Sequence, residues 1–174
     1  MKIGFDIDGV VASTQGMPVF PVKLNEEWSE FFSNAHTMKG AKEALTRLSE
    51  EHEVYFITAR FKSHADITKE WFNNSGIPYD DGRIVFMEDN IVDLTQHKRY
   101  KYERIRVLGV EVFYDDKEDI VRHLSGLCDS RLFTSWDDIV DRLCAHEAFK
   151  ELTKKVVAKQ GLPESFKKSK KKKV

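Results

Sequence analysis

The stretch that decides the fold opens the chain, where residues 1–11 read Met1-Lys2-Ile3-Gly4-Phe5-Asp6-Ile7-Asp8-Gly9-Val10-Val11. The apolar residues at positions 3, 5 and 7 are typical of a short buried strand over about 2–8. Two carboxylates end this strand, and Gly9 allows the bend that would turn both toward one site. Because ligands bind beyond the carboxyl ends of the strands in an open parallel sheet, we expect a ligand site here. Two such carboxylates repel each other, and a metal ion or a bound proton would offset the repulsion.

The rest of the chain alternates strand patterns with helix patterns. Further buried strands are predicted over 53–57, 83–87 and 110–114, with a short fifth strand around 132–133. Helices are predicted over 39–51, 63–75, 97–108, 117–125 and 136–146. Strands that alternate with helices predict an α/β fold with a parallel sheet and helices on both faces. We expect one domain over 1–160.

A short insert at about 12–37 separates the first strand from the first of these helices. Its second half has helical spacing of three aromatic residues, Trp28, Phe31 and Phe32. These rings could cover the site as a small lid or belong to the core, and we favour packing in the core or at a hinge. A large cap domain would need tens more residues than the insert has. We therefore expect an open or lightly covered site.

Polar residues also close two of the later strands. Thr58 follows Phe56-Ile57 in the run Thr58-Ala59-Arg60, and Asp115-Asp116 follows the strand at 110–114. Lys101 lies 14 residues before Asp115, which leaves room for one helix and one strand, and Lys98 and Arg99 are close competitors. Taken singly, each has a structural alternative: a helix cap for Thr58 and for Asp115-Asp116, and a solvated helix position for Lys101. Together, and in this order, they favour a common site at one sheet edge.

These residues resemble the four motifs of the haloacid-dehalogenase (HAD) phosphohydrolase superfamily over about residues 1–145. The run Asp6-Ile7-Asp8-Gly9-Val10 is similar to the first motif, Asp-x-Asp-Gly-[Thr/Val], and Thr58, Lys101 and Asp115-Asp116 match the other three. The Thr58-Ala59-Arg60 run is similar to the 5′(3′)-deoxyribonucleotidase-like branch. The resemblance implies a three-layer, Rossmann-like HAD fold with a small or absent cap.

The resemblance also implies the chemistry. Asp6 would be the nucleophile that forms an aspartyl-phosphate, and Asp8 would protonate the leaving oxygen and then activate water. Mg²⁺ would be held by Asp6, by the Asp8 main-chain carbonyl and by Asp115 and Asp116. The phosphate would be bound by Thr58, Ala59, Arg60 and Lys101. The expected substrate is a nucleoside monophosphate; the alternatives are a phosphatase acting on nucleic-acid ends and a non-catalytic HAD-fold binding module.

Composition and charge set further expectations. With 41% hydrophobic and 33% charged residues, no apparent signal peptide and no apolar run of about 20 residues, the expected class is a cytoplasmic globular protein. Cys128 and Cys144 lack metal-ligand spacing and are expected to be reduced core thiols. Residues 167–174 hold six of the 28 basic residues, so 22 basic residues stand against 29 acidic ones elsewhere. We expect 161–174 to be a disordered tail, with nucleic acid, anionic lipid, the acidic body or nothing as its partner.

Overall fold

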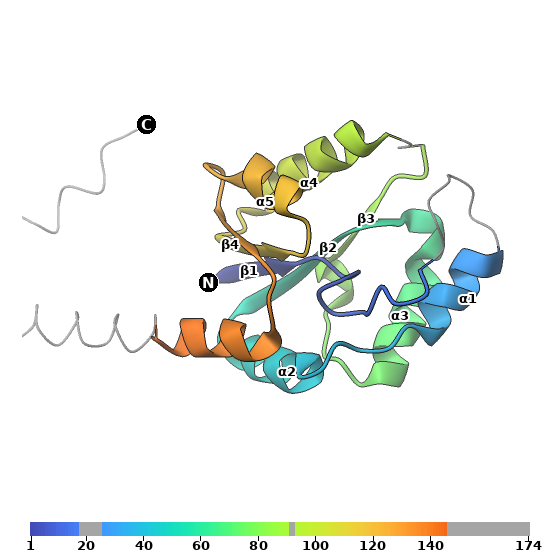
Figure 1. Ribbon diagram of the computed structural model, residues 1–174, viewed down its shortest axis with the longest axis horizontal. Coiled ribbons are helices and arrows are strands. Elements are labelled where there is room, and N and C mark those ends of the chain that lie inside the picture. The colour runs from blue at the N-terminus through green and yellow to red at the C-terminus, as the bar shows by residue number, and fades with distance from the viewer. Residues whose placement is uncertain (18–25, 91–92, 146–174) are drawn as a thin grey trace, which may run out of the picture. The chain divides into compact units, whose positions relative to one another are not determined.

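A computed structural model describes residues 1–17, 26–90 and 93–145 (Figure 1). The chain divides into two compact units, Met1–Trp136 and Asp137–Val174. The first unit carries every site residue expected above, and residues 137–145 of the second unit are helical. The lysine-rich tail, residue 146 and the prolines of the insert lie outside the described residues.

A five-stranded parallel sheet forms the centre of the first unit. Its strands lie in the order β3-β2-β1-β4-β5 and are β1 (Lys2–Phe5), β2 (Glu53–Phe61), β3 (Ile84–Met87), β4 (Val112–Asp115) and β5 (Asp129–Leu132). Within the sheet, Phe5 of β1 pairs with Phe56 of β2 and with Tyr114 of β4. The chain segments that leave β1 and β4, and the middle of β2, therefore lie side by side.

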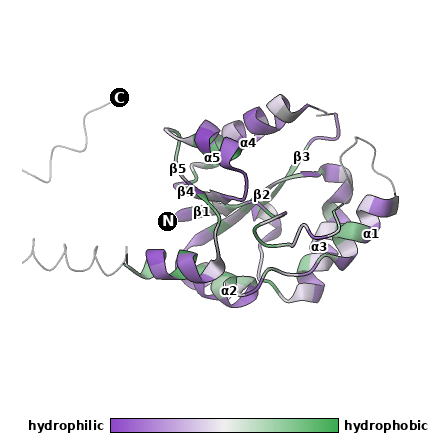
Figure 2. Cartoon of the chain, viewed as in Figure 1, coloured by the Kyte–Doolittle hydropathy of each residue, from purple (hydrophilic) through white to green (hydrophobic). Residues whose placement is uncertain are grey.

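Helices cover both faces of this sheet, which confirms the predicted fold class. The described helices of the first unit are α1 (Glu26–Asn34), α2 (Ala41–Glu51), α3 (Ala65–Ser75), α4 (Leu94–Leu108) and α5 (Glu118–Leu124), with 3-10 turns at Lys62–His64 and Asp81–Arg83. Figure 1 shows α4 and α5 on one face of the sheet and α2 and α3 on the other, with α1 beside α3. Each helix mixes hydrophobic and hydrophilic residues (Figure 2), as expected for helices that cover a sheet on one side and meet water on the other. Among the described helices, none combines the length and apolar character that crossing a bilayer requires.

Alternating side chains of the strands fill the two layers of the core. Tyr55 and Ile57 of β2 and Phe113 of β4 pack toward Ile105 of α4. On the other face, Phe5 stacks on Tyr114 at 5.4 Å and contacts the Trp136 ring. Cys128 and Cys144 are both partly buried, and neither forms a disulfide in the described part of the chain.

Several element boundaries differ from the predicted ones, and three of these differences concern the site. β1 ends at Phe5, because the Ile7 carbonyl accepts hydrogen bonds from the amides of Val11 and Ala12 and turns the chain out of the sheet. β2 continues past Thr58 to Phe61, with an irregular register between Ile57 and Phe61, so Thr58 does not end its strand. α4 begins at Leu94, three residues early, because the Asp93 side chain caps it by accepting from the Thr95 amide.

Candidate active site

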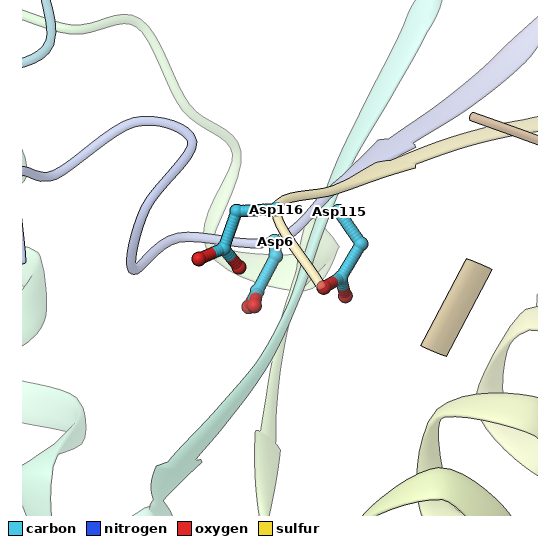
Figure 3. A group of neighbouring side chains, drawn as sticks. All are labelled: Asp6, Asp115 and Asp116. Carbon is cyan, nitrogen blue, oxygen red and sulfur yellow. The ribbon is translucent and has the colours of Figure 1, made fainter. Parts of the chain in front are cut away.

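Three carboxylates gather where the chain leaves β1 and β4. Asp6 follows β1, Asp115 is the last residue of β4, and Asp116 comes next (Figure 3). One carboxylate oxygen from each lies within 4.8 Å of the others. The Asp6 amide donates to the Tyr114 carbonyl at 2.9 Å, which ties the segment after β1 to β4 and fixes this spacing.

Lys101 is the cation that faces this group. Its ammonium lies 2.7 Å from Oδ2 of Asp6 and 2.6 Å from Oδ2 of Asp115, and its side chain is 3% exposed. It projects from the middle of α4. Lys98, its competitor, pairs instead with Asp119 and is one-third exposed. The structure therefore brings Lys101, and not Lys98, to the site.

The charges at the site do not balance within the described residues. Burial is the main cause that raises the pKa of Asp6, to about 7, and the carboxylates of Asp115 and Asp8 add to the effect against the opposing Lys101. Burial and the neighbouring Asp115 also raise the pKa of Asp116. Burial alone would lower the pKa of Lys101, but the carboxylates of Asp6 and Asp115 outweigh it and raise this pKa above its ordinary value. One ammonium thus faces three carboxylates, and the site favours a further positive charge or bound protons.

The donor set fits a hard divalent cation. Oδ1 of Asp116 is buried and accepts no hydrogen bond from the described part of the chain. The three carboxylate oxygens and the excess negative charge suit a hard cation such as Mg²⁺, which takes oxygen ligands and completes its shell with water and phosphate oxygens. The carboxylate of Asp8 is not a member of this group.

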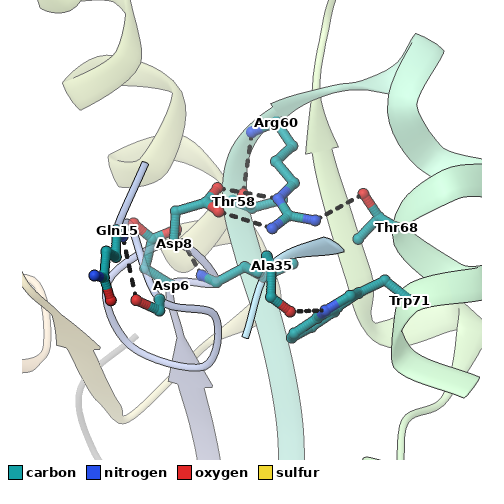
Figure 4. Close-up of polar contacts among 10 residues, drawn as sticks. Asp6, Asp8, Gln15, Ala35, Thr58, Arg60, Thr68 and Trp71 are labelled. Carbon is teal, nitrogen blue, oxygen red and sulfur yellow. Dashed lines mark hydrogen bonds and ion pairs between the residues drawn. The ribbon is translucent and has the colours of Figure 1, made fainter. Parts of the chain in front are cut away.

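The Asp8 side chain is instead held by Arg60. Nε and Nη2 of Arg60 donate to the two oxygens of Asp8 at 3.0 and 2.7 Å (Figure 4). The Arg60 side chain is fully buried, whereas 15% of the Asp8 side chain is exposed. Asp8 therefore lies at the accessible side of the site, in an orientation that a two-point ion pair fixes.

Thr58 lies on β2, two residues before Arg60. It is fully buried, and its hydroxyl accepts a hydrogen bond from the Arg60 amide at 3.0 Å. A hydroxyl that accepts can still donate its own proton, so Thr58 can offer a hydrogen bond to a phosphate oxygen. Ala59 is partly buried between them. The structure thus groups Lys101 with Asp6, Asp115 and Asp116, and it joins Arg60 to the Asp8 carboxylate and, through its amide, to Thr58.

Sequence reasoning missed the residues that surround Arg60. Phe32 of α1 and Thr68 and Trp71 of α3 contact its guanidinium. The aromatic spacing of the insert identified Phe32 as a packing residue, but no local pattern links any of the three to Arg60.

This fold is found in solved hydrolases. A HAD-superfamily hydrolase of subfamily IA from Geobacter sulfurreducens matches with a TM-score of 0.52 and 15% identity, over 80% of this chain and 97% of that one. The class C acid phosphatase of Bacillus anthracis, solved with tungstate, matches with a TM-score of 0.54 and 15% identity, over 77% of this chain and 66% of that one. A chain of the Pnkp1/Rnl/Hen1 RNA repair complex matches with a TM-score of 0.60 and 15% identity, over 76% of this chain and 42% of that one. The fold is therefore that of the HAD superfamily.

Proteins similar in sequence identify the family of this chain more closely than the fold does. No family model matches the chain. The protein named Putative nucleotidase OB0422, from Oceanobacillus iheyensis, is 32% identical over 162 residues, which cover 72% of this chain and 81% of that protein. Putative nucleotidase BH1399, from Halalkalibacterium halodurans, is 30% identical over 96 residues, 55% of this chain but only 44% of that protein. This chain belongs to the same family as OB0422, one of the proteins named as nucleotidases.

Proposed function

We propose that the chain is a magnesium-dependent phosphomonoester hydrolase that acts on nucleoside monophosphates through an aspartyl-phosphate intermediate. The observation that carries the proposal is the position of Asp6, which is buried with Asp115, lies beside the partly buried Asp116 and is held at 2.7 Å by Lys101. The names of the sequence relatives support the substrate class.

Asp6 is prepared for attack on phosphorus. Its Oδ1 accepts from the Ile7 amide at 2.8 Å and its Oδ2 contacts Lys101, so the carboxylate has one orientation. The divalent cation, held by Asp6, Asp115 and Asp116, would supply positive charge that offsets the repulsion between phosphate and carboxylates. A bond forms between an Asp6 oxygen and phosphorus, and the ester P–O bond breaks.

Asp8 supplies the proton for the leaving group. A protonated Asp8 carboxyl gives its proton to the departing nucleoside oxygen, which leaves as an alcohol. The resulting Asp8 carboxylate then accepts a proton from the water that attacks the aspartyl-phosphate, releasing inorganic phosphate and regenerating Asp6. Lys101 and the Thr58 hydroxyl stabilise the phosphoryl oxygens in both steps. Arg60 lies on Asp8 in the structure, so we assign its role through that residue.

Phosphate release from purified protein tests the proposal. The substrates are nucleoside monophosphates, sugar phosphates, p-nitrophenyl phosphate and 3′-phosphorylated oligonucleotides, each with Mg²⁺ and after exhaustive chelation. We expect metal-dependent turnover that is highest on nucleoside monophosphates and absent in Asp6→Asn. Equal turnover by wild type and Asp6→Asn would show that Asp6 is not the nucleophile. Higher turnover of the 3′-phosphorylated oligonucleotides would show that the substrate is a nucleic-acid end and not a nucleoside monophosphate.

A further inference from the structure

The ion pair between Arg60 and Asp8 does not stand alone, because the far side of the guanidinium is enclosed by rings. The Arg60 Cζ atom lies 4.1 Å from the centroid of the Phe32 ring and 5.6 Å from that of Trp71. Its remaining nitrogen, Nη1, donates to the Thr68 hydroxyl at 3.2 Å (Figure 4). All three nitrogens of the guanidinium thus have a hydrogen-bond partner and two rings pack near its carbon, which leaves it little freedom to turn.

Phe32 is the member of this set that comes from the insert. It is 3% exposed and lies on α1, and its ring also contacts the rings of Trp28 and His64. The Trp71 indole donates to the Ala35 carbonyl just after α1, at 2.7 Å, which anchors the end of the insert to α3. Phe32 is therefore held against Arg60 by the packing of α1 on α3.

A buried guanidinium stacked on a ring resists displacement. The contact of a cation with an aromatic face is stronger when both are shielded from water, as they are here. A cation fixed in this way in turn fixes its two-point partner, whose oxygens must follow the planar fork of the guanidinium. Arg60 thus orients the Asp8 carboxylate, and Phe32, with Thr68 and Trp71, holds Arg60.

We propose that Phe32 of the insert helix, acting through Arg60, is a positioning residue for Asp8. The inference rests on the proposed function, in which Asp8 protonates the leaving oxygen. It assigns the insert a part in the chemistry other than that of a lid, since Phe32 is packed against a buried side chain.

The inference predicts a dependence on the leaving group. A nucleoside oxygen must be protonated as it departs, whereas p-nitrophenolate leaves without a proton. The value of kcat/KM includes only the steps up to departure of the leaving group, so it excludes the later attack of water. Loss of Asp8 positioning should therefore lower kcat/KM for a nucleoside monophosphate much more than for p-nitrophenyl phosphate. A general loss of structure would lower both alike.

The experiment measures kcat/KM on both substrates for Phe32→Leu, Phe32→Tyr, Arg60→Lys and the control Phe31→Leu. Phe31 neighbours Phe32 on α1, and its ring contacts the rings of Trp28 and Phe32. For Phe32→Leu we expect a loss of about three- to tenfold on the nucleotide and less than about twofold on p-nitrophenyl phosphate. Phe32→Tyr and Phe31→Leu should remain near wild type on both. Arg60→Lys should show a larger selective loss, because an ammonium cannot form the two-point contact.

Wild type and Asp8→Asn are assayed in parallel as references. If the wild-type protein hydrolyses neither substrate, the proposed function is wrong. If it hydrolyses both, the two kcat/KM values of each variant test the positioning role. The positioning role of Phe32 would be overturned by equal losses of kcat/KM on the two substrates, by no loss in Phe32→Leu, or by the same selective loss in Phe31→Leu. Thermal unfolding shows whether each variant is folded. If Phe32→Leu does not fold, the same comparison of the losses in kcat/KM on the two substrates is made with Phe32→Met and Arg60→Lys.

Discussion

The backbone of Gly9 lies directly against the carboxylate of Asp116. A Cβ atom at Gly9 would be 2.3 Å from Oδ2 of Asp116 and 2.4 Å from its carboxyl carbon. Gly9 also has a φ of +85°, a backbone conformation that residues with a Cβ atom rarely adopt. The absence of a side chain at Gly9 thus leaves room for the carboxylate of Asp116, a candidate metal ligand.

Gly9→Ala should therefore displace Asp116 and weaken metal binding. We expect the Mg²⁺ concentration for half-maximal activity to rise about tenfold or more, with a lower melting temperature from the strained φ. Gly16→Ala is a matched control, because Gly16 has a φ of +81° but an open space where the Cβ would lie. A Mg²⁺ requirement that rises equally in both variants would contradict the contact with Asp116 as the cause.

Lys101→Ala should lower turnover far more than Lys98→Ala. Removing one donor to the transferring oxygens typically costs about 100- to 1000-fold in kcat. Lys98 lies on the same helix but pairs with Asp119, so its removal should change kcat less than about twofold. Steady-state kinetics at saturating Mg²⁺ compare the two, and a larger loss in Lys98→Ala would move the phosphate-binding role to Lys98.

Asp6→Asn should be inactive yet more stable than wild type in the absence of metal. The pKa of Asp6 is raised from 3.8 to about 7 in the folded protein, mainly by burial. The folded state thus holds this proton more tightly than the unfolded chain, and the associated stability is lost as the pH rises from about 4 through 7. In chelator, the melting temperature of wild type should fall below that of Asp6→Asn by about 5 °C as the pH rises over this range. A constant difference between the two curves would argue against the raised pKa.

Metal removal should abolish activity, and calcium should restore it poorly. Mg²⁺ demands near-octahedral geometry at about 2.0–2.1 Å, whereas Ca²⁺ accepts more ligands at about 2.3–2.6 Å and would loosen the alignment of phosphate with Asp6. Mg²⁺ should also raise the melting temperature, an effect that Asp116→Ala should reduce. Full turnover after exhaustive chelation would exclude the metal-dependent mechanism.

Deletion of residues 167–174 tests whether the substrate is a nucleoside monophosphate or a nucleic-acid end. Its six lysines would add salt-dependent attraction to phosphates, whatever the nucleotide sequence. We expect kcat/KM on nucleoside monophosphates to change less than about twofold. A large loss confined to 3′-phosphorylated oligonucleotides, with a shallower salt dependence, would instead favour nucleic-acid ends as the substrate.

Local sequence patterns were enough to predict the α/β fold. The alternation of apolar strands with amphipathic helices depends on residues close in sequence, and it predicted the parallel sheet that the structure confirms. The order of Asp6, Thr58, Lys101 and Asp115 along this alternation predicted one sheet edge, since parallel strands bring their carboxyl ends together. Asp116 followed from its place beside Asp115.

Only the tertiary structure decided how these residues are paired. Lys98 and Lys101 have similar local sequence contexts, and the packing of α4 on the sheet alone buries Lys101 between Asp6 and Asp115. Arg60 reaches Asp8 because β2 continues three residues past Thr58, and its neighbour Phe32 comes from a different helix. Asp8 and Arg60 are 52 residues apart in sequence, and such contacts depend on how whole elements pack, which no periodicity within one element records.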